Sequence, residues 1–159
     1  MSDTQTFYKA GSYRVESSVG YLVNKLAQTF GRELDRRMVD LGLTDAQWKP
    51  LLLLQQELCT TAADIARFAH HDTGAVTRLL DRLEDKGLIE RLRSAEDRRI
   101  VNLALTKEGK RIAAEVPKIT AQLANQALAG FSKEEFHQFQ DLLNRALCNV
   151  KALNEDDAS

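Results

Sequence analysis

The segment from Thr73 to Leu105 constrains the fold more than any other part of this chain. Its sequence, TGAVTRLLDRLEDKGLIERLRSAEDRRIVNLAL, predicts an amphipathic helix, a stop at Gly87 and two short strands over 88–93 and 99–105. A charged turn at 94–98 joins the two strands. A helix followed by an arginine-rich hairpin has a shape that lies against a nucleic-acid duplex. We therefore expect a winged helix-turn-helix, mainly α with a small β-hairpin wing.

Composition places the chain among ordinary globular proteins. Its 159 residues suit one domain with a dimerisation extension, and its contents of 43% hydrophobic and 28% charged residues are unexceptional. No apolar run approaches the roughly 18 residues that cross a bilayer, and the N-terminus lacks the order of a secretory signal. We therefore expect a cytoplasmic protein with no membrane contact. The net charge of −1 argues against indiscriminate coating of nucleic acid but allows a local basic surface.

Two long apolar stripes flank this segment. Apolar residues recur at helical spacing over 15–41, about seven turns of helix, and Gly42 is expected to end that helix. A near-heptad seam occupies 136–153. One small domain cannot bury these stripes, so both are expected to pack on a partner. The expected parts are an N-terminal arm and dimerisation helix at 1–42, a DNA-binding lobe at 43–106 and C-terminal dimerisation helices at 107–159.

Capping residues mark the beginnings of the other helices. These are Thr44 with Gln47, Thr61, Asp72, Thr106, and Ser132 with Glu135. Pro50 removes a backbone donor, so we expect either a kink just before it or a helix whose regular part starts later. Pro117 predicts a bend within a single helix whose stripe runs over 112–127. Phe131 is expected to pack on Phe136 ahead of the last helix.

The helix that begins near Thr73 has the features of a recognition helix. A helix enters the major groove readily where its leading side chains are short, as those of Thr73, Gly74 and Ala75 are. Thr77 can hydrogen-bond a base or a phosphate, and Arg78 can reach a guanine edge or clamp a phosphate. The alternative is the solvated outer face of an ordinary amphipathic helix.

The arginines of the hairpin favour the DNA-binding interpretation. Arg98 in a tight turn suits insertion into a minor groove, and Asp97 beside it can hold the guanidinium in one pose. The alternative for this pair is a surface ion pair of little energetic value. The candidate DNA contacts are Thr73, Gly74, Ala75, Thr77, Arg78, Arg82, Arg93, Asp97, Arg98 and Arg99.

Two segments, LTDAQWKPLLLL at 43–54 and DIARFAHHDTGAVTRLLDRLEDKGLIERLRSAEDRRIVNLALTKEGK at 64–110, resemble the MarR family of bacterial transcription regulators. The most specific element is DRR at 97–99, followed by a strand and LTKEG at 105–109. The resemblance implies a homodimer in which the first and the last two helices interlock. It also implies a ligand-responsive regulator, usually a repressor. Its double-stranded operator would be palindromic, with two recognition helices about 34–36 Å apart.

The resemblance further implies release from DNA by a small aromatic acid or phenol, bound between the dimer helices and the DNA-binding lobe. Candidate ligand-binding residues near that junction are Ser12, Arg14, Trp48, Lys49 and His70. A pocket for such a ligand needs an apolar slot and a cation or several donors. The ordinary alternatives are core packing for Trp48, solvation for Arg14 and turn packing for His70.

Other function classes find less support in the sequence. Peroxide-sensing members of the family carry a reactive cysteine early in the first helix, whereas Cys59 and Cys148 lie elsewhere. A redox-responsive regulator of the same fold, which would use a cysteine switch, is the alternative function. Two cysteines are too few for a disulfide framework or a zinc site. No catalytic spacing, metal cluster or glycine-rich phosphate loop is visible, so we expect no enzyme, metal or cofactor. A winged helix used only for protein contacts is the remaining class.

Overall fold

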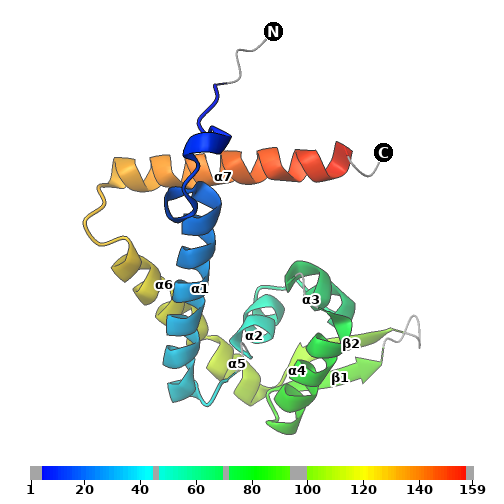
Figure 1. Ribbon diagram of the computed structural model, residues 1–159. Helices are drawn as coiled ribbons and strands as arrows, with labels where there is room; N and C mark the ends of the chain where they lie inside the picture. The colour runs from blue at the N-terminus through cyan, green and yellow to red at the C-terminus, as the bar shows by residue number, and fades with distance from the viewer. Residues whose placement is uncertain (1–4, 45–46, 70–71, 94–99, 157–159) are drawn as a thin grey trace. The chain divides into compact units, whose positions relative to one another are not determined.

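The computed structural model describes residues 5–44, 47–69, 72–93 and 100–156 (Figure 1). Within them the chain is mostly helical with one antiparallel hairpin, so the predicted fold class is confirmed. Residues 1–120 form one compact unit and residues 121–159 a second. In the described part of the chain, no helix is both long enough and apolar enough to span a bilayer.

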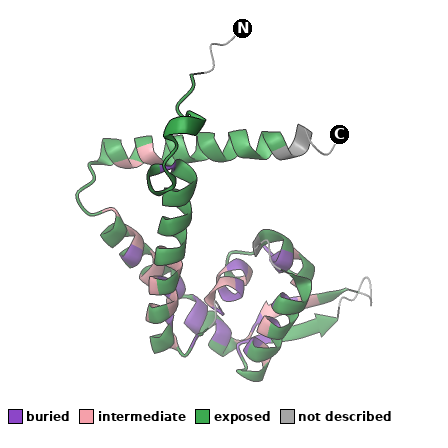
Figure 2. Cartoon of the chain, in the orientation of Figure 1, coloured by how far each residue is buried: buried purple, intermediate pink, exposed green. Residues whose placement is uncertain are grey.

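The elements, where η marks a short 3-10 helix, are η1 Ala10–Ser12, η2 Val15–Ser17, α1 Val19–Met38, η3 Val39–Leu41, α2 Trp48–Gln55, α3 Ala62–Ala69, α4 Thr73–Asp85, β1 Ile89–Arg93, β2 Val101–Leu105, α5 Lys107–Ala113, α6 Val116–Ala127 and α7 Lys133–Asp156. Buried residues gather in α2 to α5 and the hairpin (Figure 2). This lobe therefore holds most of the core of the first unit.

Helix α1 begins later than predicted because Ser18 caps it. The Ser18 backbone is extended (φ −74°, ψ 144°), and its Oγ accepts a hydrogen bond from the N–H of Tyr21 at 3.3 Å. The hydroxyl of Tyr8 accepts a second bond, from the N–H of Val19 at 2.9 Å. The apolar stripe is therefore divided among η2, α1 and η3, and the prediction of one continuous helix was wrong. Gly42 ends the segment as predicted, with a left-handed backbone (φ 69°).

Helix α2 begins at Trp48, so the later of the two predicted starts is the one observed. The predicted start at Thr44 was wrong: Gln47 is the N-cap and makes no side-chain bond to the first turn of α2. Half of the predicted capping box is present, because Gln47 Oε1 accepts a hydrogen bond from the N–H of Thr44 at 3.1 Å. Pro50 lies in the first turn, where N–H groups have no partner within the helix, so its missing donor costs no hydrogen bond. The proline is buried in the core instead.

Helices α3 and α4 form the helix-turn-helix, and each begins at a predicted capping residue. At α3 the cap is reciprocal. The N–H of Asp64 donates to Thr61 Oγ1 at 3.2 Å, and the N–H of Thr61 donates to Asp64 Oδ2 at 3.1 Å. At α4, Asp72 Oδ1 accepts a bond from the N–H of Ala75 at 3.0 Å. The inner face of α4 buries Val76, Leu80 and Leu83.

Strands β1 and β2 pair in antiparallel register, with Ile89 opposite Leu105 at the base of the hairpin. The middle of β2 is attached to the start of α3, where the N–H of Leu103 donates to the carbonyl of Thr60 at 2.8 Å and Asn102 bridges Thr61. Strand β1 begins one residue after its predicted start. The predicted turn and the predicted first residue of β2 lie outside the described residues.

Backbone contacts join the end of the hairpin to the end of α4. The N–H of Thr106 donates to the carbonyl of Leu88 at 3.1 Å, and its hydroxyl donates to the carbonyl of Gly87 at 2.6 Å. The same hydroxyl accepts a bond from the N–H of Gly109 at 3.0 Å, so Thr106 caps α5 as predicted. A Cβ at Gly109 would lie 1.8 Å from the carbonyl oxygen of Leu88, so glycine is required there. These four residues are called the hairpin junction below.

The prediction of one bent helix around Pro117 was wrong, because α5 and α6 are separate helices. Helix α5 ends at Ala113, and the N–H of Glu115 then turns back to the carbonyl of Ile112 at 3.0 Å. Pro117 is the second residue of α6. A proline at this position has no N–H to continue the ladder of α5, and its ring crowds the carbonyl four residues earlier. The break therefore comes before the proline.

Helix α7 begins with the predicted capping box. Ser132 Oγ accepts a bond from the N–H of Glu135 at 3.1 Å, and the N–H of Ser132 donates to Glu135 Oε2 at 2.8 Å. Phe131 makes its ring contact with Phe139, at 5.9 Å between centroids, one turn beyond the predicted Phe136. The capping prediction is confirmed, and the aromatic contact is displaced by one turn.

Gly109→Ala is expected to lower the free energy of unfolding by about 1–3 kcal/mol, because the new methyl group forces the Leu88 carbonyl to move. Denaturant titration at one protomer concentration measures the change. Gly20→Ala is the matched control, since a Cβ there meets nothing within 4 Å. Alanine at that position is expected to be neutral or to stabilise by up to about 1 kcal/mol. Equal stability of the two variants would contradict the close approach.

Candidate nucleic-acid interface

The N-terminal half of α4 presents short side chains to solvent. Thr73, Gly74 and Ala75 are all exposed. A Cβ at Gly74 would lie 3.0 Å from Asp72 Oδ1, so the absence of a side chain there leaves room for the capping carboxylate. Thr77 is also exposed, and its hydroxyl donates to the carbonyl of Thr73 at 2.9 Å. A surface with so little side-chain bulk allows another molecule to approach the helix backbone closely.

Two pairs of charged residues on α4, two arginines and two acids, lie near the wing. Arg78 and Arg82 lie four positions apart and share one side of the helix, and both are exposed. Asp81 and Glu84 lie three positions apart on the adjoining side of the helix. They are called the acidic pair below. The outer surface of α4 thus carries both signs of charge.

Arg91 of β1 connects the wing to the acidic pair. Its Nη2 lies 2.6 Å from Asp81 Oδ1, and its Nη1 donates to Glu84 Oε2. The hydrogen bond that Arg91 donates to Asp81, aided by the charge of Glu84, raises the pKa of the Arg91 guanidinium above its ordinary value. Sequence reasoning did not identify Arg91 as a site residue, because no spacing rule relates a strand to acids on the preceding helix. These three residues are called the Arg91 clamp below.

The described part of the wing ends at an exposed arginine. Arg93 is the last residue of β1 and is exposed. The predicted wing-tip residues Asp97, Arg98 and Arg99 lie outside the described residues. Their contacts with DNA therefore stay predictions.

Lys86, the residue after α4, connects that helix to the start of α2. Its Nζ donates to the carbonyl of Gly42 at 2.7 Å and to Gln47 Oε1 at 2.8 Å. Gln47 is 1% exposed, so its amide oxygen depends on donors from the protein. A lysine is ordinary near a helix C-terminus, but its partners lie 44 and 39 residues away in sequence and could not be predicted.

The predicted effector residues fall into two groups at opposite ends of α1. Ser12 belongs to η1 and Arg14 precedes η2, so both come before the helix. Trp48 Nε1 donates to Asp35 Oδ1 near the far end of α1, at 2.8 Å, and Lys49 Nζ lies 5.5 Å from the Trp48 ring centroid. About 25 Å of helix separates the groups at 1.5 Å per residue. One small ligand on a single subunit therefore cannot contact both groups.

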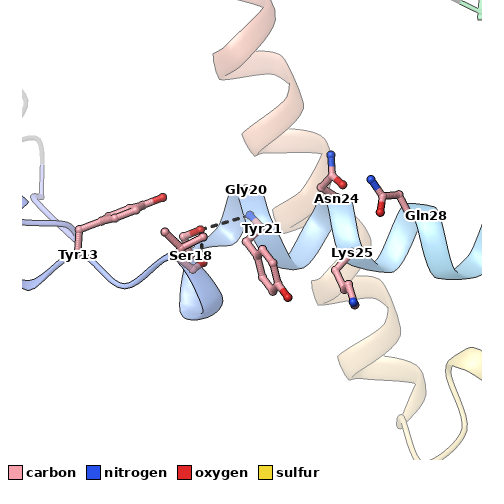
Figure 3. Close-up of a pocket in the computed structure, with 8 residues that line it drawn as sticks. Tyr13, Ser18, Gly20, Tyr21, Asn24, Lys25 and Gln28 are labelled. Atoms are coloured by element: carbon pink, nitrogen blue, oxygen red, sulfur yellow. Dashed lines mark hydrogen bonds between the residues drawn. The ribbon is translucent and has the colours of Figure 1, made fainter.

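A cavity of about 560 Å³ lies beside the first turns of α1 (Figure 3). It is lined by Tyr13, Val15, Ser18, Gly20, Tyr21, Asn24, Lys25 and Gln28. Ser12 and Arg14 flank Tyr13 in sequence but are not part of the lining. The sequence carries a signal of this cavity that the sequence analysis did not use. It is a polar row from Tyr21 to Gln28, whose members recur three and four positions apart. His70, the last predicted effector residue, lies outside the described residues.

The two cysteines differ in exposure. Cys59 is 4% exposed, and burial raises the pKa of its thiol, which opposes formation of the reactive thiolate that a peroxide sensor requires. Cys148 is exposed on α7. Across the described ranges, no group of three or more His, Cys, Asp or Glu side chains is arranged to hold a metal ion.

Comparison with known proteins identifies the family. The sequence profile of the MarR family matches residues 43–101, from just before α2 into β2. The multiple antibiotic resistance protein MarR of Escherichia coli K12 is 32% identical over 130 residues, which are 81% of this chain and 90% of that protein. The chain belongs to the MarR family. It is a MarR-family transcription regulator, and the matched segment contains the helix-turn-helix and the start of the wing.

Solved structures of similar proteins include two DNA complexes. A cysteine-to-serine variant of E. coli MarR in complex with operator DNA has a TM-score of 0.72 and 31% identity, and the match covers 81% of this chain and 93% of that one. The complex of S. aureus MepR with DNA has a TM-score of 0.73 and 25% identity, with 86% and 99% covered. The MarR-family winged-helix fold is therefore shared over most of this chain.

In this MarR-family protein, Lys86→Met is expected to lower the free energy of unfolding by about 1–3 kcal/mol, because Gly42 and the buried Gln47 each lose a charged donor. Denaturant titration at a constant protomer concentration gives the value. Lys110→Met, at an exposed lysine of α5, is the matched control and is expected to stay within about 0.5 kcal/mol of wild type. A loss in Lys86→Met no larger than in the control would show that the contact contributes nothing.

Proposed function

We propose that this regulator binds a palindromic operator as a homodimer and represses transcription by blocking the promoter. In each subunit α4 enters a major groove, and the arginine-rich wing reaches the adjacent minor groove. A small aromatic acid or phenol then releases the complex by favouring a dimer in which the two recognition helices are mis-spaced.

The surface of α4 is the observation that carries this proposal. Its first turn offers Thr73, Gly74 and Ala75, which are short enough to admit the backbone to a groove. The positive end of the helix dipole lies there and favours a nearby phosphate. Arg78 follows one turn later, exposed and able to reach a base edge. The solved operator complex of the related E. coli MarR variant supports the same use of the fold.

Exposed apolar faces on two helices support the homodimer. On α1 they include Val19, Leu22, Val23 and Leu26, and on α7 Leu142, Leu143, Leu147, Val150 and Leu153. Apolar faces of this extent on a soluble subunit mark protein interfaces. We therefore assign dimerisation to 1–42 and 107–159, and DNA binding to 43–106.

The cavity beside α1 is our candidate site for the effector. Its volume of about 560 Å³ is that of a small-molecule pocket. Lys25 supplies an ammonium group for a carboxylate, and Tyr13 and Tyr21 supply aromatic walls and phenol groups (Figure 3). This set suits a benzoate or a hydroxybenzoate. The group of Trp48 and Lys49 at the other end of α1 is the second candidate site.

Operator binding is tested by fluorescence anisotropy on the upstream DNA of the regulator's own gene. Affinity is expected to fall steeply as salt is raised, because binding releases counterions. Arg78→Ala and Arg98→Ala are each expected to weaken binding by about 1–3 kcal/mol, with the dimer intact by sedimentation. Arg36→Ala, at an exposed arginine of α1 that is bonded to Glu33, is the matched control and is expected to bind normally. Wild-type affinity in both test variants would contradict the interface.

The effector is tested by titrating benzoate, salicylate and the hydroxybenzoates against the protein–operator complex. Lys25→Met is expected to raise the concentration needed for release by about tenfold, the loss of one charge-assisted hydrogen bond. Lys49→Met is the matched control and is expected to respond as wild type. The reverse pattern would place the effector beside Trp48, and no release by any of these acids would reject the class of effector.

A further inference from the structure

The two strands of the wing hairpin have different support. Strand β2 is attached to the start of α3, because the N–H of Leu103 donates to the carbonyl of Thr60 at 2.8 Å and Asn102 forms a β-bridge with Thr61. Strand β1 is buried at Ile89 and exposed over 90–93. A two-stranded hairpin has little stability of its own in water, so a contact between β1 and α4 supports it on the other side.

The Arg91 clamp provides this lateral contact at the middle of β1. The two terminal nitrogens of Arg91 bind different carboxylates, one on Asp81 and one on Glu84. A guanidinium is a planar, rigid fork, so two partners determine its direction as well as its position. The side chains of Arg91, Asp81 and Glu84 are 31%, 51% and 38% exposed, so water screens the attraction, and the geometry of the fork carries the argument. The strand is thereby held against the side of α4.

The clamp also neutralises the acidic pair on a helix that is proposed to approach phosphates. Carboxylates without a partner would repel DNA at this position. A phosphate that used the same two N–H donors of Arg91 would have to displace both carboxylates. We propose that Arg91 is a positioning residue for operator binding, which sets the angle between wing and α4 so that both reach their grooves together. The inference rests on the proposed function.

Removing the acidic pair distinguishes positioning by Arg91 from direct contact with DNA, because the two roles predict opposite signs. If Arg91 positions the wing, Asp81→Asn combined with Glu84→Gln releases the hairpin and weakens operator binding. If Arg91 binds a phosphate, the same double variant frees the guanidinium and removes two negative charges, so binding becomes tighter.

The operator affinities of five variants are measured by anisotropy at one salt concentration. The double variant and Arg91→Met are each expected to bind about tenfold more weakly, and combining them is expected to add little, because all three residues form one network. Arg91→Lys keeps the charge but loses the fork, so it is expected to resemble Arg91→Met. Asp85→Asn, which removes an exposed carboxylate at the end of the same helix, is the matched control and is expected to bind as well as wild type or slightly better.

A second readout needs no DNA. Amide hydrogen exchange of β1 and β2 in the free protein is expected to be faster in the double variant than in Asp85→Asn. Wild-type protein that binds no DNA would reject the proposed function, and the exchange rates would still decide whether the clamp holds the wing. Unchanged or tighter operator binding by the double variant, or unchanged exchange in the hairpin, overturns the inference.

Discussion

The close approach of Gly109 to the carbonyl of Leu88 is the contact on which the DNA-binding lobe depends. It brings the start of α5 against the end of α4, and Thr106 then bonds to both Gly87 and Leu88. Strand β1 begins and β2 ends at this junction, so the hydrogen bonds of Thr106 close the base of the wing. The hairpin junction holds the wing at its base, and two contacts farther out hold its sides: β2 with the start of α3, and Arg91 of β1 with α4.

Basic residues around α4 serve two different purposes, and their number alone overstates the charge available to DNA. Arg91 and Lys86 are engaged inside the subunit, one with the acidic pair and one with Gly42 and Gln47. Arg78 and Arg93 are exposed on the surface proposed to meet DNA. A chain with a net charge of −1 can present a basic surface because some of its acids are already paired beside that surface.

Local signals in the sequence were sufficient for the parts of the fold that depend on neighbours within four residues. The caps at Thr61, Asp72, Thr106 and Ser132 are of this kind, and all are present. Ser18 was missed because the apolar spacing continues across it, although a hydroxyl cap starts the helix there. The contacts of Lys86, Arg91 and Gly109 join separate elements, so no periodic spacing in the sequence predicts them. The cavity beside α1 was missed in a similar way, because apolar spacing drew attention to the opposite face of that helix.

Helix α1 links the proposed effector cavity to α4, the proposed recognition helix. The cavity lies at its first turns, and beyond its last turn the carbonyl of Gly42 accepts a bond from Lys86, at the end of α4. A helix transmits tilt along its length, so an effector that tilts α1 displaces Gly42 relative to Lys86. Hydrogen bonds weaken steeply beyond about 3.5 Å, so a displacement on the order of 1 Å is enough to break this one. In the proposed mechanism the effector therefore needs only to prefer the tilted state, in which this bond between Gly42 and Lys86 is lost.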